Sequence, residues 1–265
     1  MGFTKLDAGE NVVVAQSQVQ LYAINPSECR LRVGAGSVAD VVLLHGDDAN
    51  LSTLISLEVG ATLHLTEIFM GSGSIDVVVN HAEGAISKVV AASLTRTSAL
   101  YNMQLCAQGA FSELYTLQMG AERDNNSIRI NMRHLAPDCS SRSLSKCVGS
   151  GESNLRFDGL VYVAQDAQRT AAEQNCRSIE LSDTSHIVAQ PQLEIYADDV
   201  KCTHGATMGQ VDTDAILYMR QRGLSEMQAR RLQIEGFITD IVEKCNLGEL
   251  GDALRETLVQ KLETM

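Results

Sequence analysis

The sequence contains no tryptophan, and aromatic residues make up only 4% of its 265 residues. Proteins that bind sugars or nucleic-acid bases commonly stack them on aromatic faces, so this scarcity argues against both kinds of ligand. Proline is rare as well and occurs only at Pro26, Pro137 and Pro191. Because proline interrupts the hydrogen bonds of a sheet, its rarity permits long, continuous ladders of strands.

The sequence also lacks an excess of positive charge, because its formal net charge is −12. Contacts with phosphate backbones and anionic membranes need clustered Lys and Arg, so we expect neither nucleic acid nor a membrane as a partner. No apolar run approaches the roughly 18 residues that span a bilayer. The first residues lead into no apolar stretch of the kind found in secretory signals.

The seven cysteines include no Cys-x-x-Cys pair. This excludes the common zinc-ribbon and thioredoxin-type motifs. An odd number of cysteines without a secretory signal is typical of a reducing compartment, where thiols stay free. We therefore expect a cytoplasmic protein.

Glycine divides the first part of the chain into short segments. Glycines recur at intervals of 11 to 14 residues from residue 34 to residue 84. Strands at this spacing favour a sandwich, a barrel or a solenoid, and the lack of intervening helices excludes doubly wound α/β folds. Periodicity alone leaves sandwich and solenoid nearly even. The apolar or alternating runs are Val41–Leu44, Leu51–Leu57, Ala61–Phe69, Ile75–Val79 and Ala85–Leu94.

The pattern becomes helical after Gln210. Asp212 or Thr213 can cap a first helix that ends at Gly223, and Ser225–Gln228 is typical of a capping box for a second helix. Apolar stripes on the second and a third helix either pack on each other or on the end of a solenoid, or dock a partner. The stripe positions are Met227, Ile234, Ile238, Ile241 and Cys245, then Leu250, Leu254, Leu258 and Leu262.

Cys202 and His204 form the most informative chemical pattern, placed just after an alternating segment and just before the first helix. Side chains at i and i+2 of a strand project from the same face. Thiolate and imidazole together suit zinc, copper or iron–sulfur chemistry. Two ligands do not close a site, so further ligands would come from elsewhere in the chain or from a second chain. On spacing alone, a Cys that serves only as packing remains the simpler interpretation.

Asp198 and Asp199 are the main rival to that pair. Two carboxylates can serve acid–base catalysis on carbohydrates, which would make the chain a β-helix hydrolase or lyase. Adjacent residues on a strand face opposite ways, however, so a turn between two strands is the favoured interpretation. Gly205–Gly209 is followed by no Gly-Lys-Ser/Thr, so any ATPase activity must reside in a partner.

His134 lies near Cys139 and Cys147, and a nucleophile activated by this histidine is conceivable. No Gly-x-Ser-x-Gly elbow is present, so we expect these residues to be structural. Three other histidines lie in successive strand-like segments, where core or edge imidazoles are commoner than stacked metal ligands. They are His45, His64 and His81.

Between Asn131 and Gly223 the chain carries an ordered series of distinctive segments. They are His134–Ser141, Phe157–Val163, Ala167–Thr170, Gln174–Asn175, Leu181–Ser182, Pro191–Val200, Lys201–Gln210 and Tyr218–Gly223. This series resembles the core of the SufB/SufD family of iron–sulfur cluster assembly scaffolds. Gly205, directly after His204, favours the SufD-like branch, because SufB-like chains tend to carry Glu there.

The resemblance implies a right-handed parallel β-helix over residues 1–210, followed by a helical C-terminal segment over residues 211–265. It implies a non-enzymatic scaffold subunit that pairs through the solenoid end with a SufB-like subunit, or with itself when isolated. The C-terminal helices would contact a SufC-like ABC ATPase. Family members usually carry a long helical N-terminal region that is missing here, so we expect a fragment or a short relative.

The resemblance also implies that Cys202 and His204 contribute to a nascent iron–sulfur cluster or iron site. That site would lie near the subunit interface and be shared transiently with the partner chain. A purely structural interaction protein, in which the same two residues only pack, is the remaining alternative.

Overall fold

The computed structural model describes residues 4–5, 11–14, 18–26, 28–245, 257–258 and 260–262. In this part of the chain the strands alternate between two sheets and are followed by the helices α1 and α2. The nine-stranded sheet contains β1 (Thr4–Lys5), β3 (Gln18–Ile24), β5 (Val38–His45), β7 (Thr62–Phe69), β9 (Ile86–Ser93), β11 (Phe111–Gly120), β13 (Ser140–Gly149), β15 (Thr170–Glu180) and β17 (Val200–Gly209). The eight-stranded sheet contains β2 (Asn11–Val14), β4 (Glu28–Val33), β6 (Ala49–Leu57), β8 (Gly73–His81), β10 (Thr97–Leu105), β12 (Asn125–His134), β14 (Asn154–Val163) and β16 (His186–Ile195).

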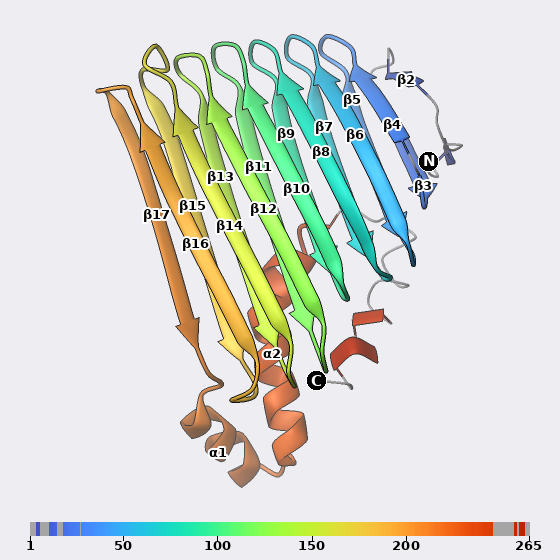
Figure 1. Cartoon of the computed structure of the whole chain (residues 1–265), viewed down its shortest axis with the longest axis vertical. Helices are drawn as coiled ribbons and strands as arrows, with labels where there is room; N and C mark the ends of the chain where they lie inside the picture. Colours follow the sequence, from blue (N-terminus) through green and yellow to red (C-terminus); the bar gives the residue numbers. More distant parts are fainter. Residues whose placement is uncertain are drawn as a thin grey trace.

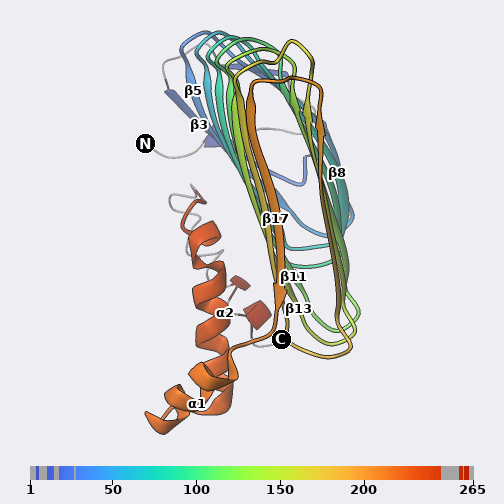
Figure 2. The same ribbon diagram turned by 90° about the vertical axis from the view of Figure 1, so that its left-hand side faces the viewer.

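Each strand pairs in parallel with the strand two places later in the chain. The chain therefore winds as a flattened solenoid in which one coil adds one strand to each sheet (Figure 1). Figure 2 shows the two sheets face to face, with tight turns joining them at the ends. The predicted parallel β-helix is confirmed. The five apolar runs predicted as strands correspond to β5 through β9.

The space between the sheets is filled by alternate residues of the strands from β3 to β16. β6 shows the simplest pattern, with buried and exposed side chains in turn from Ala49 to Ile55, as expected of a strand with one face in water. β7, by contrast, is buried on both faces from Leu65 to Phe69. The difference arises because α2 covers the outer face of the nine-stranded sheet, whereas no helix of the described residues covers the outer face of the eight-stranded sheet.

Helix α1 (Thr213–Gln221) and helix α2 (Glu226–Val242) begin where their caps predict. The Asp212 side chain accepts hydrogen bonds from the first backbone N–H groups of α1, and Gly223 after it has a φ of 101°. Ser225 and Gln228 form the predicted capping box of α2. No helix in the described residues is long and apolar enough to cross a membrane.

The apolar stripe of α2 packs on the flank of the solenoid and not on its end, which is one of the alternatives that the sequence leaves open. Ile234, Ile238 and Ile241 are buried against outward-facing residues of the nine-stranded sheet, such as Ile68 and Leu117. This arrangement is favoured because the outer faces of β5 to β13 carry an apolar patch that would otherwise meet water.

One predicted member of the stripe, Met227, is 79% exposed. It lies in the first turn of α2, which together with α1 extends beyond the end of the sheet (Figure 2). Leu258 and Leu262 of the predicted third helix contact the same apolar cluster as α2. Leu250 and Leu254 lie outside the described residues.

A buried lysine fastens α2 to the sheet. Lys146 on β13 is 4% exposed and donates to the Asp240 carboxylate at 2.6 Å and to the backbone carbonyl of Phe237. Its ammonium also lies 4.6 Å from the centre of the Phe237 ring. Because a buried ammonium needs such partners, it fixes where along the sheet the helix docks.

We expect Lys146→Met to lower the free energy of unfolding by about 1–3 kcal/mol, because it leaves Asp240 and the Phe237 carbonyl without their charged donor. Urea denaturation followed by circular dichroism measures this loss. The control is Arg123→Met, which removes an exposed pair with Glu152 and should cost less than about 1 kcal/mol. Equal costs for the two variants would contradict the fastening role of Lys146.

Candidate functional site

Cys202 and His204 lie on β17, the last strand of the nine-stranded sheet. β16 ends the other sheet, so both sheets stop at the same end of the solenoid (Figure 1). Val200 and Cys202 pack against the apolar core between the sheets, and His204 follows on the same face of the strand. The two candidate side chains therefore face the interior of the final coil, at the end where no further coil of the described chain covers it.

The two side chains differ in their exposure to solvent. Cys202 is half-buried, and burial raises the pKa of its thiol above the ordinary value. His204 is exposed. A bound metal cation or a neighbouring positive charge would be needed to hold Cys202 as a thiolate at neutral pH. The pair suits coordination of an incoming cation better than free nucleophilic chemistry.

The interior behind this pair changes character along the nine-stranded sheet. The row that ends at His204 is apolar on the early strands and becomes polar on the last ones. In chain order the row reads Leu21, Val41, Leu65, Val89, Leu114, Ser143, Gln174 and His204. The two neighbouring rows contain buried polar residues on early strands as well, namely Glu67 and His45. On the later strands they contain Thr116, Ser145 and Cys176, and Gln118, Cys147 and Ser178, all buried.

This polar interior was not anticipated from the sequence. The signal was present in the row of His204, because β13 and β15 carry Ser143 and Gln174 where β5, β7 and β9 carry Val41, Leu65 and Val89. Only the strand register shows that these residues point inward and lie behind Cys202 and His204.

Two further cysteines belong to the polar interior. A hydrogen bond between the thiols of Cys147 and Cys176 raises the pKa of Cys147, and burial adds to this rise. The same hydrogen bond lowers the pKa of Cys176, which lies beside Ala206 of β17 in register. Cys176 is therefore the more acidic thiol of the pair.

Cys202 and His204 fit a metal or cluster only as part of an open site. In the described part of the chain, no three His, Cys, Asp or Glu side chains lie close enough together to hold a metal ion. One thiol and one imidazole on one face supply donors that iron and zinc accept. The remaining ligands would have to come from groups other than Cys202 and His204, and the end of the solenoid is open to a second chain.

The rival carboxylates form a turn, as the sequence indicates. Asp198 and Asp199 are exposed in the bend between β16 and β17. The Asp199 N–H donates to the Gln168 side chain, and its carbonyl accepts from the Arg169 N–H. These contacts join the last turn to the turn before it, so the two aspartates do not form a catalytic pair.

His134 is structural, since it is fully buried and its Nε2 lies 2.8 Å from the Ser141 hydroxyl. Burial lowers its pKa to about 4, and the nearby His81 contributes to this shift. Burial likewise lowers the pKa of His81 to about 4.

His64 pairs with Asp40 on the outer face of the sheet, and His45 is buried inside the solenoid. The three histidines predicted to be structural do not gather around one point.

His45 belongs to a buried polar cluster that the sequence did not predict. Its Nε2 lies 3.5 Å from the Glu67 carboxylate, which accepts a hydrogen bond from the Tyr101 hydroxyl at 2.6 Å. Burial, followed by the charge of Glu67, raises the pKa of Tyr101 well above its ordinary value. The cluster is enclosed between the sheets far from β17, so it belongs to the core rather than to the candidate site.

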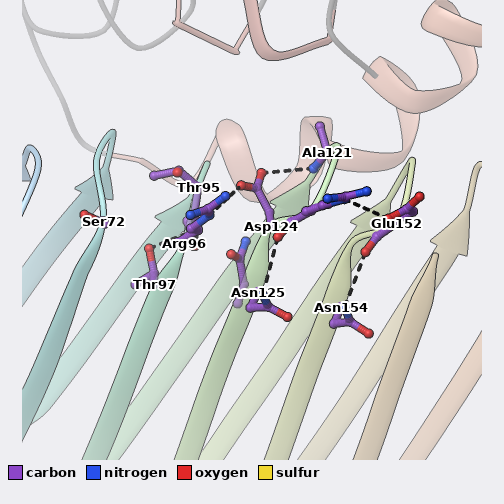
Figure 3. Close-up of polar contacts among 12 residues, drawn as sticks. Ser72, Thr95, Arg96, Thr97, Ala121, Asp124, Asn125, Glu152 and Asn154 are labelled. Carbon is purple, nitrogen blue, oxygen red and sulfur yellow. Dashed lines mark hydrogen bonds and ion pairs between the residues drawn. The ribbon is translucent and has the colours of Figure 1, made fainter. Parts of the chain in front are cut away.

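A cleft of about 470 Å³ lies on the eight-stranded sheet, and the residues that line it include Arg96, Asn125 and Asn154. Figure 3 shows Arg96 directed toward Asp124, which also accepts the Ala121 N–H. Asn154 donates to the carbonyl of Glu152, which lies two residues earlier in the turn that leads into β14. Arg96 thus links two successive turns, whereas Asn154 is held within its own turn.

We expect the stability of the fold to fall as the pH is lowered from 6.5 to 4. His81 and His134 bind protons in the unfolded chain over this range but resist protonation when buried, so each removes up to about 1.4 kcal/mol per pH unit. Urea denaturation at several pH values measures this slope. His134→Gln should reduce it, whereas His186→Gln, at an exposed histidine, should change it little. An unchanged slope in His134→Gln would contradict the assignment.

The family model for the SufBD core domain of SUF-system FeS cluster assembly matches residues 15–237 of the chain. Among curated proteins, the iron–sulfur cluster assembly protein SufD of Escherichia coli is 34% identical over 140 residues, which is 53% of this chain and 33% of that protein. A SufBD family protein of Mycobacterium bovis is 28% identical over 240 residues, which is 87% of this chain and 59% of that protein. The chloroplastic protein ABCI7 of Arabidopsis thaliana is 33% identical over 155 residues, which is 58% of this chain and 33% of that protein.

The matched regions thus span about a third of the Escherichia coli and Arabidopsis proteins and somewhat more than half of the mycobacterial one.

Proposed function

The chain belongs to the SufBD core family of iron–sulfur cluster assembly proteins, and from that premise we propose that it is a SufD-like scaffold subunit. In this role it pairs with a SufB-like subunit and a SufC-like ABC ATPase. Cys202 and His204 contribute ligands to a nascent cluster or iron site at the interface between the two scaffold chains. The chain itself is not an enzyme in this proposal, and ATP is hydrolysed by its partner.

The observation that carries the proposal is the position of Cys202 and His204 in the last coil. Both sheets end at β16 and β17, so the backbone edges and the inward side chains of this coil are available to a second solenoid. A second chain stacked here would cover the pair and add the missing ligands. Alone, the same end can pair with another copy of this chain.

The chemistry is coordination of a cargo that must later be released. Binding of iron displaces the proton of Cys202, whose pKa burial keeps above the ordinary value, so the empty site remains a neutral thiol. His204 binds through a neutral ring nitrogen. A site with two ligands from each of two chains opens when the chains separate, which allows the cargo to leave.

The helical segment over residues 211–265 is the proposed docking surface for the ATPase. α2 uses its apolar stripe on the solenoid, so only the opposite surfaces of the helices are available to a partner. Leu217 and Tyr218 on α1 and Leu232 on α2 are each more than half exposed. Apolar side chains exposed on adjacent helices are typical of a protein interface.

A reducing compartment such as the cytoplasm suits this function. All seven cysteines are free thiols, including the half-buried Cys202. An oxidising environment would favour disulfides at accessible thiols and would compete with coordination of iron.

We expect the double variant Cys202→Ser/His204→Ala to lose the charge-transfer absorption of the cluster. The chain is co-expressed with SufB-like and SufC-like partners, reconstituted with iron and sulfide without oxygen, and measured by absorption spectroscopy. Loss of the bands in a complex that still assembles supports the proposed site.

Cys106→Ser is the matched control, because Cys106 is an exposed thiol away from β17. Its absorption should equal that of the unchanged chain. Unchanged bands in the double variant would confine the chain to a structural role and move the ligands onto the partner.

A second prediction concerns the ATPase. We expect Leu217→Asp/Tyr218→Ala to reduce co-purification of the SufC-like partner about tenfold or more, since hot-spot residues at interfaces often contribute 2 kcal/mol or above. Leu54→Asp, on the uncovered face of the eight-stranded sheet, is the control and should leave co-purification unchanged. Equal retention of the partner by both variants would argue against docking through α1.

A further inference from the structure

Gln174 on β15 is a buried amide without a hydrogen-bond partner. Gln174 is 1% exposed, and neither Nε2 nor Oε1 of its side chain forms a hydrogen bond within the described structure. An unpaired buried amide costs about 1–3 kcal/mol, and leucine, of similar size, would avoid that cost. A polar side chain at this position therefore points to a partner that it meets in another state of the protein.

The register places that partner next to it. Gln174 pairs with His204 of β17 on one side and with Ser143 of β13 on the other, and all three side chains project from the same face. Adjacent strands lie about 4.8 Å apart, so the carboxamide is within reach of an imidazole turned toward the interior.

The opposite wall leaves room for the carboxamide. On β14, a Cβ added to Gly159 would collide with the Gln174 Nε2 and with the tip of the Phe157 ring. Glycine at this position lets the Gln174 side chain extend across the space between the sheets. Gly159 and Phe157 thus border the amide on the opposite wall, and the register places Gln174 next to His204.

An amide in this place has a defined chemical use. An imidazole that binds metal through one nitrogen carries a proton on the other, and a nearby acceptor holds the ring in that tautomer and orientation. The oxygen of Gln174 is such an acceptor. It is also a poor ligand for iron compared with thiolate and imidazole, so it would not replace them.

We propose that Gln174 is a positioning residue for His204, which it holds turned into the final coil by accepting the N–H of the nitrogen that does not bind metal. This inference rests on the proposed function, because it assumes that His204 is a ligand. It adds the residue that orients this ligand, and it accounts for the unpaired amide.

The test uses Co²⁺ as the probe, added without oxygen to the complex of the full chain with SufB-like and SufC-like partners. The thiolate-to-cobalt absorption band gives the Kd. Gln174→Leu should weaken binding about 10- to 100-fold. Gln174→Glu, which keeps an acceptor oxygen, should restore affinity to within about threefold of the unchanged chain. Ser143→Ala, one strand further inside the same row, is the matched control and should bind normally.

Thermal unfolding of the same variants separates positioning from folding. Gln174→Leu should have a Tm equal to or above that of the unchanged chain, since it removes an unpaired amide. Weak binding together with a lowered Tm, without recovery in Gln174→Glu, would mean that the residue is only structural and would overturn the inference.

His204→Ala distinguishes the two proposals. If it binds Co²⁺ as tightly as the unchanged chain, His204 is not a ligand and both the proposed site and this inference fail. If His204→Ala binds weakly while Gln174→Leu binds normally, the site stands and the positioning role of Gln174 is overturned.

Discussion

The structure depends on the in-register stacking of parallel coils. Each strand pairs with the strand two places later, and the pairing keeps inward residues above inward residues along both sheets. A shift of one residue in any strand would turn its apolar side chains outward and its polar side chains inward, so the register is strongly fixed. The position of every candidate ligand follows from this constraint, because it determines which side chains share a face and which lie behind one another.

Stacking also leaves the last coil without a neighbouring coil on one side in the described chain. Interior coils have a neighbour on each side, whereas β16 and β17 have a neighbour on one side only in the described chain. In the row of His204 the interior becomes polar toward this end, from the Leu21–Val89 part of the row to Ser143, Gln174 and His204. An interior of this kind is costly for a core but useful beside a site that accepts a polar or charged cargo.

The C-terminal helices are constrained by the outer surface of the nine-stranded sheet. That surface carries an apolar patch, and α2 covers it with Ile234, Ile238 and Ile241 while Lys146 fixes its position through Asp240. The same packing directs other apolar residues of α1 and α2, including Leu217 and Leu232, toward solvent. One side of the helical segment therefore covers the sheet, and the other side presents a surface to a partner.

The sequence by itself determined the strands, because alternating apolar residues between regularly spaced glycines specify strand and turn locally. It also determined both helix caps, since Asp212, Ser225 and Gln228 act within a few residues of their own positions. The placement of Cys202 and His204 on one strand face follows from the period of two. The SufB/SufD resemblance supplied the choice of a solenoid over a sandwich, which periodicity left open.

Only the tertiary structure decided what depends on contacts between distant segments. The docking of α2 on the flank, with Met227 exposed, depends on an apolar patch assembled from strands that are far apart in the chain. The polar interior behind His204 and the unpaired amide of Gln174 depend on the register between strands about 30 residues apart. Local patterns carry no information about that register, so the surroundings of the candidate site emerged only from the folded chain.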